Sequence, residues 1–164
     1  MSVDPLVFRS AMARLATGVT ILTTRRGDRH EVMTANAVTS VSLHPTLVLA
    51  SISSESTWLQ AVRCCGRFAV NVLAAHHEDL ARWCADHARH EQPEAITRHD
   101  VSVSPESGLL LFNDALVTAE CRAHAEHLAG DHVLVLGEVI AIDVRDACAE
   151  PLVFFDRGYG RVVS

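Results

Sequence analysis

The chain has 164 residues, 49% of them apolar, and carries 20 acidic against 14 basic residues, for a formal net charge of −6. This length and hydrophobicity exclude a disordered chain and predict one domain, residues 1–164, that builds its own core. The basic residues are all arginines scattered along the chain, and the apolar runs are far shorter than the roughly 20 residues of a membrane span, so we expect neither a nucleic-acid nor a membrane partner.

The first predicted element is a helix over residues 4–16. Asp4 is a suitable N-cap, and Pro5 fits the first helical position, where the missing N–H costs nothing. Phe8 and Met12 follow at helical spacing on one face. The helix is expected to stop before Gly18.

Most other predicted elements are strands, recognised as short β-branched and apolar runs between turn residues. They cover residues 19–24, 31–43, 46–53, 68–73, 116–124 and 132–144. Helices with an apolar face are expected at 56–64 and 78–90, and residues 91–115 are expected to be mostly irregular. About six strands without regular strand–helix alternation favour a barrel over a doubly wound sheet.

The segment from Met33 to Leu43 carries a row of small polar residues. If it is one strand, the two-residue period places Thr34, Asn36, Val38, Ser40 and Ser42 on one face. A flat heterocycle with alternating donors and acceptors, such as an isoalloxazine, needs a row of this kind. A solvent-facing strand with ordinary hydroxyl side chains explains the same pattern, and by spacing alone it is the stronger interpretation.

The next polar segment, Ser51 to Thr57, leads from a predicted strand into a predicted helix. Hydroxyl groups and free amides at a helix N-terminus suit a phosphate group. Taken alone, however, the segment is better explained as a plain N-cap formed by Ser54 or Ser56.

Two later segments combine turn residues with polar or aromatic side chains. Gly130-Asp131 is typical of a hairpin turn, and His132 after it faces either a pocket or solvent. The closing residues 151–161 contain aromatic side chains and two arginines, and they form either a docked tail or part of a site.

Short motifs occur along nearly the whole chain in a fixed order. They are Phe8-Arg9-Ser10-Ala11-Met12, Ala16-Thr17-Gly18-Val19-Thr20, Met33-Thr34-Ala35-Asn36, Phe68-Ala69-Val70-Asn71-Val72-Leu73, Glu120-Cys121, Gly130-Asp131-His132 and Gly137-Glu138-Val139. Together they resemble the flavin reductase family with the FMN-binding split-barrel fold. Members of this family are the small reductase components of two-component flavin-dependent monooxygenases.

The resemblance implies a mainly β fold with peripheral helices, an FMN-binding split β-barrel. It implies an NAD(P)H:flavin oxidoreductase, in which hydride passes from nicotinamide C4 to flavin N5 and the protein supplies orientation and exclusion of water. The implied cofactors are FAD or FMN together with NADH. NADPH is less expected, because no arginine pair is clearly placed for its 2′-phosphate. The implied partners are a second copy of the chain, in a homodimer, and a monooxygenase component that receives the reduced flavin.

The same resemblance assigns small polar residues and their neighbours to the flavin site. The implied flavin-binding residues are Thr34, Ala35, Asn36, Ala37, Thr39, Ser40, Ser42, Ser51, Ser53, Ser54, Ser56 and Thr57. On the nicotinamide side it implies His132 with Tyr159 or Arg161. No side chain is assigned to a catalytic proton transfer, because the hydride moves between the two cofactors.

Two other functions fit the sequence. One is a flavin-binding carrier or sensor without turnover, because Ala37 stands where the family usually has serine and Glu55 lies in the phosphate segment. The other is an enzyme that keeps its flavin and reduces a small organic substrate itself.

Neither a metal nor a disulfide framework is expected from the histidines and cysteines. His87 and His90 have helical spacing, but no acid or thiol completes a ligand set with them. The five cysteines are an odd number and form no Cys-x-x-Cys motif. They predict reduced thiols and a cytoplasmic location.

Overall fold

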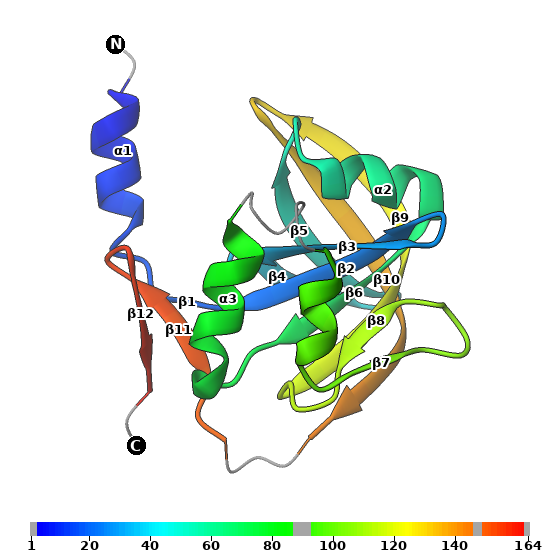
Figure 1. Cartoon of the computed structure of the whole chain (residues 1–164). Helices are drawn as coiled ribbons and strands as arrows, with labels where there is room; N and C mark the ends of the chain where they lie inside the picture. Colours follow the sequence, from blue (N-terminus) through cyan, green and yellow to red (C-terminus); the bar gives the residue numbers. More distant parts are fainter. Residues whose placement is uncertain (1–2, 87–92, 146–148, 163–164) are drawn as a thin grey trace.

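An antiparallel sheet of seven strands dominates the computed structural model, which describes residues 3–86, 93–145 and 149–162 (Figure 1). Its strand order is β3-β2-β6-β9-β10-β5-β4. In chain order the strands are β2 (Thr20–Arg26), β3 (Arg29–Ala35), β4 (Val38–Leu43), β5 (Thr46–Ser53), β6 (Arg67–Val72), β9 (Val117–Ala129) and β10 (His132–Val144). The predicted mainly β class is confirmed.

The two edge strands of this sheet, β3 and β4, follow one another directly in the chain. Only Asn36 and Ala37 separate them, yet β3 pairs with β2 and β4 pairs with β5 at the opposite edge. The sheet therefore curls until its edges meet at these two residues. No ladder joins β3 to β4 among the described residues, so the barrel stays open along this seam.

The prediction of one strand over residues 31–43 was wrong. The run contains no Gly or Pro and is rich in β-branched and hydroxyl residues, so the sequence pattern carries no clear sign of a break. In the structure the chain bends at residues 36–37 because the strand changes its pairing partner there. A register shift between Ser40 and Ser42 disturbs the two-residue alternation a second time.

Helix α1 (Pro5–Met12) begins as predicted and ends earlier than predicted. The carboxylate of Asp4 accepts hydrogen bonds from the amides of Leu6 (2.7 Å) and Val7 (3.4 Å), which caps the helix. No residue of α1 is buried, and Figure 1 shows the helix standing apart from the barrel. The chain leaves the helix to form β1 (Thr17–Gly18), which pairs with β11 (Leu152–Phe155).

A second, three-stranded sheet carries the end of the chain. Its order is β1-β11-β12, with β12 spanning Gly158–Arg161. The closing segment is therefore a hairpin whose first strand is fixed by the residues that follow α1. The predicted tail is therefore docked on β1, and this pairing brings residues from both ends of the chain together.

Residues 91–115 are more regular than predicted. They contain the 3₁₀ helix η3 (Pro93–Arg98) and a hairpin of β7 (Val101–Val103) and β8 (Leu110–Phe112). Both strands are too short to show a sequence period. The hairpin is held by tertiary contacts instead: the hydroxyl of Thr23 donates to the carbonyl of Leu110 (2.7 Å), and the amide of Phe112 donates to the side chain of Asn71 (3.1 Å).

Two apolar clusters pack on the two sides of β2, because neighbouring residues of a strand face opposite ways. Leu22 belongs to the barrel interior, where helix α2 (Thr57–Cys65) inserts Trp58 against Phe68 at a ring distance of 5.5 Å. Ile21 belongs to a second cluster under α3 (Glu78–Ala85), which also contains Phe112. The 3₁₀ helix η1 (Ala75–His77) leads into α3.

Both later helices begin within one residue of the expected positions, but α3 ends at Ala85, where Asp86 is extended, and the predicted end at residue 90 falls outside the described residues. The predicted hairpin turn at Gly130-Asp131 joins β9 to β10, and Gly130 adopts a left-handed backbone with φ of +67°. None of the described helices is long and apolar enough to span a membrane.

Candidate functional site

The seam between β3 and β4 is the centre of the candidate site. Asn36 and Ala37 are both exposed there, and the amide of Ser51 on β5 donates a hydrogen bond of 2.9 Å to the carbonyl of Ala37. The structure thus brings the first part of the predicted flavin segment beside the start of the predicted phosphate segment. The antiparallel pairing of β4 with β5, in which Val38 lies opposite Ala50, brings these residues together.

The predicted polar face is only partly assembled. Thr34 and Asn36 line one cavity, but the hydroxyl of Thr34 already donates to the carbonyl of Ala81 on α3 at 2.6 Å. The side-chain amide of Asn36 donates to the hydroxyl of Thr17 at 3.2 Å. Thr34 is therefore held in place by α3 and offers a ligand only its lone pairs, whereas Asn36 keeps a free carbonyl oxygen.

On β4 the polar side chains serve local structure. The hydroxyl of Ser42 accepts a hydrogen bond from the amide of His44 at 3.2 Å, and the hydroxyl of Thr39 donates to the carbonyl of Ser40 at 3.3 Å. The bend at residues 36–37 separates this strand from Thr34. The single row of groups predicted from an unbroken strand is therefore not present.

The segment from Ser53 to Thr57 joins β5 to α2, as predicted. Ser56 is the N-cap residue of α2, but its side chain makes no capping hydrogen bond and instead contacts the sulfur of Met33 at 3.7 Å. Among the described residues the hydroxyl of Ser54 caps no helix amide either, and its own amide donates to the carbonyl of Asp131 at 3.0 Å. The first amides of α2 therefore donate to no capping side chain and are available to an anion. This favours the phosphate interpretation of the segment over a plain N-cap.

His132 lies beside the segment predicted to bind phosphate. It stands opposite Ser53 in the ladder between β10 and β5, and its Nδ1 is 2.8 Å from a carboxylate oxygen of Asp131. The hydrogen bond and the charge of His132 lower the pKa of Asp131. His132 does not line the cavity that contains Tyr159, so the two predicted nicotinamide residues are not brought together within one chain.

Tyr159 lines a small cavity with residues of the seam. This cavity of about 110 Å³ is lined by Val19, Thr34, Asn36, Ala85, Phe154 and Tyr159. The ring of Tyr159 packs edge-to-face on Phe154 at 5.3 Å, and burial raises the pKa of its hydroxyl. The third predicted nicotinamide residue, Arg161, pairs with Glu150 at 3.4 Å and lines none of these cavities.

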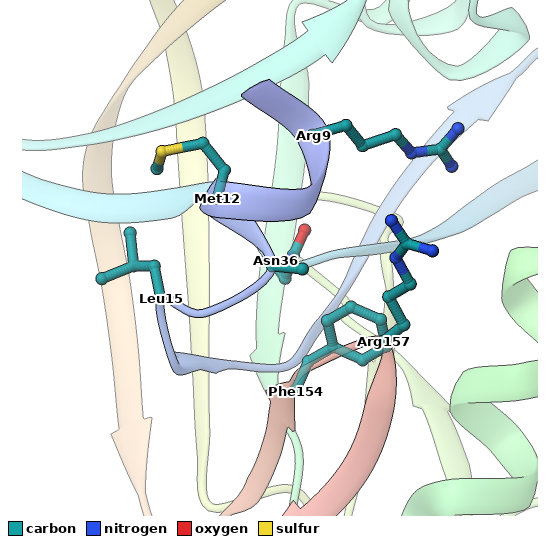
Figure 2. A pocket seen from close by; sticks show the side chains of 7 residues that line it. Arg9, Met12, Leu15, Asn36, Phe154 and Arg157 are labelled. Atoms are coloured by element: carbon teal, nitrogen blue, oxygen red, sulfur yellow. The ribbon is translucent and has the colours of Figure 1, made fainter. Parts of the chain in front are cut away.

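A larger cavity of about 330 Å³ continues from the same two residues, Asn36 and Phe154 (Figure 2). Its lining is Arg9, Met12, Ala13, Leu15, Asn36, Phe154 and Arg157. Its size is that of a small-molecule site. Arg9 lies in the first sequence motif and Arg157 in the closing segment, but nothing in the sequence pattern places the two in one cavity.

A second group of polar side chains lies where α3 begins. His76, His77 and Asp114 place their side-chain atoms within 4.8 Å of one another, a spacing that a metal ion could bridge. However, Nδ1 of the buried His77 accepts a hydrogen bond from the amide of Ala74 at 3.1 Å. In the neutral ring the proton then sits on Nε2, which lies 3.0 Å from the carboxylate of Asp114. A metal-binding histidine normally donates from its second nitrogen, so this geometry favours a histidine–carboxylate contact over metal ligation.

Comparison with known proteins identifies the architecture around the seam. The family model of the flavin reductase like domain matches residues 12–162. The chain belongs to this family. The match begins at Met12 and ends just after Arg161, so it includes the seam, the smaller cavity and the β11–β12 hairpin, whereas Arg9 of the larger cavity lies before it.

Two relatives and one solved structure of this family cover most of the chain. The chain is 40% identical to the NADH-dependent FMN reductase AsuE2 of Streptomyces nodosus subsp. asukaensis over 93% of this chain and 82% of that one. It is 34% identical to the reductase component of 4-hydroxyphenylacetate 3-monooxygenase of Thermus thermophilus over 95% of both. The NADH:FAD oxidoreductase SgcE6 of Streptomyces globisporus, solved in complex with NAD and FAD fragments, superposes with a TM-score of 0.89 at 33% identity over 99% of this chain and 97% of that one.

Proposed function

We propose that this chain is an NADH-dependent flavin reductase that supplies reduced flavin to a partner monooxygenase. The observation that carries the proposal is the position of Asn36 at the seam. Asn36 belongs to the segment that resembles the family's flavin site, and it also lines the two cavities that contain Tyr159 and Arg157. Hydride transfer requires the two cofactor rings to lie against one another, and at the seam the flavin segment borders the cavity of Tyr159. The named relatives support NADH as donor and both FMN and FAD as acceptors.

The chain's own residues orient the two cofactors and keep water out. When bound, the flavin and the nicotinamide supply the redox chemistry between them. Asn36 and the backbone at Ala37 would hold the ring system, and the uncapped amides of α2 with Ser53 and Thr57 would hold the phosphate end. Phe154 and Tyr159 would provide an apolar wall on the nicotinamide side, with the phenol neutral because burial raises its pKa.

The partner and the oligomeric state are proposals of the same kind. The named relatives include a reductase component of a monooxygenase, which supports a partner of that class. Helix α1 supports a homodimer: it is eight residues long and leaves Val7 and Phe8 exposed, two side chains that line neither cavity beside Arg9. A helix this short is marginal alone in water, so contact with a second copy would stabilise it. Light scattering after size exclusion measures this directly.

The predicted extent and location of the protein also stay proposals. We take residues 1–164 as one functional domain, since β2 contributes to both apolar clusters and neither cluster is complete without it. The cytoplasmic location is supported by four described cysteines that are free thiols, among them the buried Cys84 and Cys121. Burial raises the pKa of the Cys121 thiol to about 12, which keeps it unreactive.

NADH oxidation by the purified protein tests the function. Turnover should depend on added FMN or FAD, because a reductase of this kind uses flavin as a substrate. No turnover with any flavin would support a carrier or sensor instead. Turnover that needs only a small organic acceptor would support an enzyme that keeps its flavin. NADPH at equal concentration should react more slowly than NADH.

A further inference from the structure

Two arginines line the larger cavity without a carboxylate partner. Arg9 projects from α1 and Arg157 from the turn between β11 and β12, and Figure 2 shows both side chains at the same opening. The two also share a neighbouring cavity with Leu6 and Ser10. Among the described residues, neither guanidinium is recorded in an ion pair, and Arg157 donates only to the neutral hydroxyl of Ser10 at 2.8 Å.

The acidic residue next to Arg157 in the chain is paired with another arginine. The carboxylate of Asp156 pairs with Arg14 at 3.5 Å. Two positive side chains thus share one concave surface on a chain whose net charge is −6. Such a local excess of positive charge attracts an anion.

The backbone of Arg157 is in the left-handed region, which glycine and asparagine adopt more easily than arginine. Asp156 and Arg157 form the two-residue turn of the hairpin, with φ of +49° and +65°. Glycine and asparagine are favoured at such positions because left-handed backbone crowds a side chain. Here the second position carries an arginine that lines a cavity, and strained residues of this kind gather at binding sites.

The same turn is fixed to α1, so the two arginines come from elements that are held together. The amide of Asp156 donates a hydrogen bond of 2.7 Å to the carbonyl of Ala13 at the end of α1. Together with the contact between Arg157 and Ser10, this ties the turn to the helix at two points. The cavity between them is therefore formed before any ligand binds.

We propose that Arg9 and Arg157 bind the phosphoryl oxygens of a nucleotide cofactor, and that this cofactor is the nicotinamide dinucleotide. Guanidinium groups match phosphate oxygens with paired hydrogen bonds. The larger cavity shares its lining residues Asn36 and Phe154 with the cavity of Tyr159, so a nicotinamide ring beside Tyr159 would place its diphosphate near the arginines. The flavin phosphate has its own expected place at the start of α2. This inference rests on the proposed function.

Steady-state kinetics with two hydride donors tests the proposal. Arg9→Gln and Arg157→Gln should each raise the KM for NADH by about tenfold, the loss expected for one charge-assisted hydrogen bond. The KM for dihydronicotinamide riboside, which carries no phosphate, should stay within about twofold. Arg26→Gln removes the same charge at the turn between β2 and β3, on the other side of the molecule from α1 in Figure 1, and should leave both constants unchanged.

Two further variants separate charge from structure. Ser10→Ala removes the hydrogen bond to Arg157 but keeps both charges, so the KM for NADH should change by less than about twofold. Arg157→Lys should recover much of the loss, since it keeps the positive charge. If Ser10→Ala raises the KM as much as Arg157→Gln does, Arg157 only fastens the hairpin to α1 and the proposal fails.

Flavin and ADP-ribose binding distinguish the remaining outcomes. If the glutamine variants weaken FMN and FAD but not riboflavin, and leave the KM for NADH unchanged, the arginines bind the flavin phosphate and our assignment to the dinucleotide is overturned. Calorimetry with ADP-ribose needs no turnover. If the parent protein does not oxidise NADH but binds ADP-ribose, and both glutamine variants lose that binding, the proposed function is refuted and the anion site stands. Unchanged ADP-ribose affinity would refute the anion site.

Discussion

Arg82 lies over the ring of Tyr159, with its guanidinium carbon 4.8 Å from the ring centroid. Arg82 is itself held by Glu78 one helical turn earlier, at 2.6 Å. On another side the ring packs against Phe154. Helix α3 thus positions the aromatic side chain of β12 that lines the cavity at the seam, although the two elements are distant in the sequence.

The ionisation of Tyr159 should report this contact. Burial raises the pKa of the phenol above its ordinary value of 10, while the nearby charge of Arg82 opposes the rise. Arg82→Met should therefore raise the pKa further, because the phenolate loses a favourable cation. Tyr159 is the only tyrosine, so ultraviolet absorbance against pH measures it without interference. Arg63→Met, on α2, is the control and should leave the pKa of Tyr159 unchanged; a fall in Arg82→Met would contradict the contact.

Replacement of Asn36 by leucine should weaken flavin binding. Asn36 belongs to the segment that resembles the family's flavin site and is exposed at the seam, so its loss would leave a flavin polar group without a partner, at a cost of about 1–3 kcal/mol. Fluorescence titration with FMN and FAD measures the dissociation constants. Asn113→Ala, on the loop after β8, should leave them unchanged. Equal constants for the parent and a folded Asn36→Leu variant would remove Asn36 from the site.

Thr57→Ala should affect phosphorylated flavins selectively. Thr57 opens α2, where the first amides have no side-chain cap, and its hydroxyl is exposed. The variant should weaken FMN and FAD by about 1 kcal/mol, and riboflavin by much less, since riboflavin has no phosphate. Thr46→Ala, at the other end of β5, serves as control. An equal loss for all three flavins would show that Thr57 only supports the helix.

The buried His77 should make the protein less stable in acid. Burial lowers its pKa below 6.5, although the contact with Asp114 opposes this. The unfolded chain then binds the proton more readily than the folded one, so the free energy of unfolding should fall as the pH drops below about 6.5. Urea unfolding at pH 7.5 and 5.5 measures the fall.

His77→Asn is the matched variant for this effect. The asparagine oxygen replaces Nδ1 as acceptor for the amide of Ala74, but it does not titrate. The fall in stability between the two pH values should therefore be smaller in His77→Asn and unchanged in the control His127→Asn. A residual fall is expected from His30, whose pKa burial and Arg25 also lower. An undiminished fall in His77→Asn would assign the effect to other groups.

Gly137→Ala should destabilise the barrel. A Cβ atom at this position would meet the ring of Phe68 and lie 2.9 Å from Cβ of Cys121, and both residues are fully buried. Overpacking of this kind costs about 1–3 kcal/mol. Gly18→Ala is the control, because nothing lies within 4 Å of its Cβ position. Thermal and urea unfolding compare the two; equal midpoints would mean that the core relaxes around the added methyl group.

Local chemistry explains what the sequence predicted correctly. Asp4 and Pro5 fix the start of α1, and Gly130 fixes a turn, because capping and backbone freedom depend on residues next to one another. The ordered motifs indicated the flavin reductase family, and the family match over residues 12–162 agrees. The mainly β class followed from the same short β-branched runs.

Tertiary structure decided what local pattern does not contain. The sequence of residues 31–43 predicts one strand, but in the structure the chain passes from one edge of the sheet to the other at Asn36. The β7–β8 hairpin depends on hydrogen bonds with Thr23 and Asn71 from other strands. Likewise, Arg9 and Arg157 are distant in the sequence and form one cavity only because the last hairpin docks on the first helix. Sequence alone determined the capped helix, the turns and the family, since these depend on near neighbours. The seam and the arginine cavity arise from long-range pairing, which has no local signature.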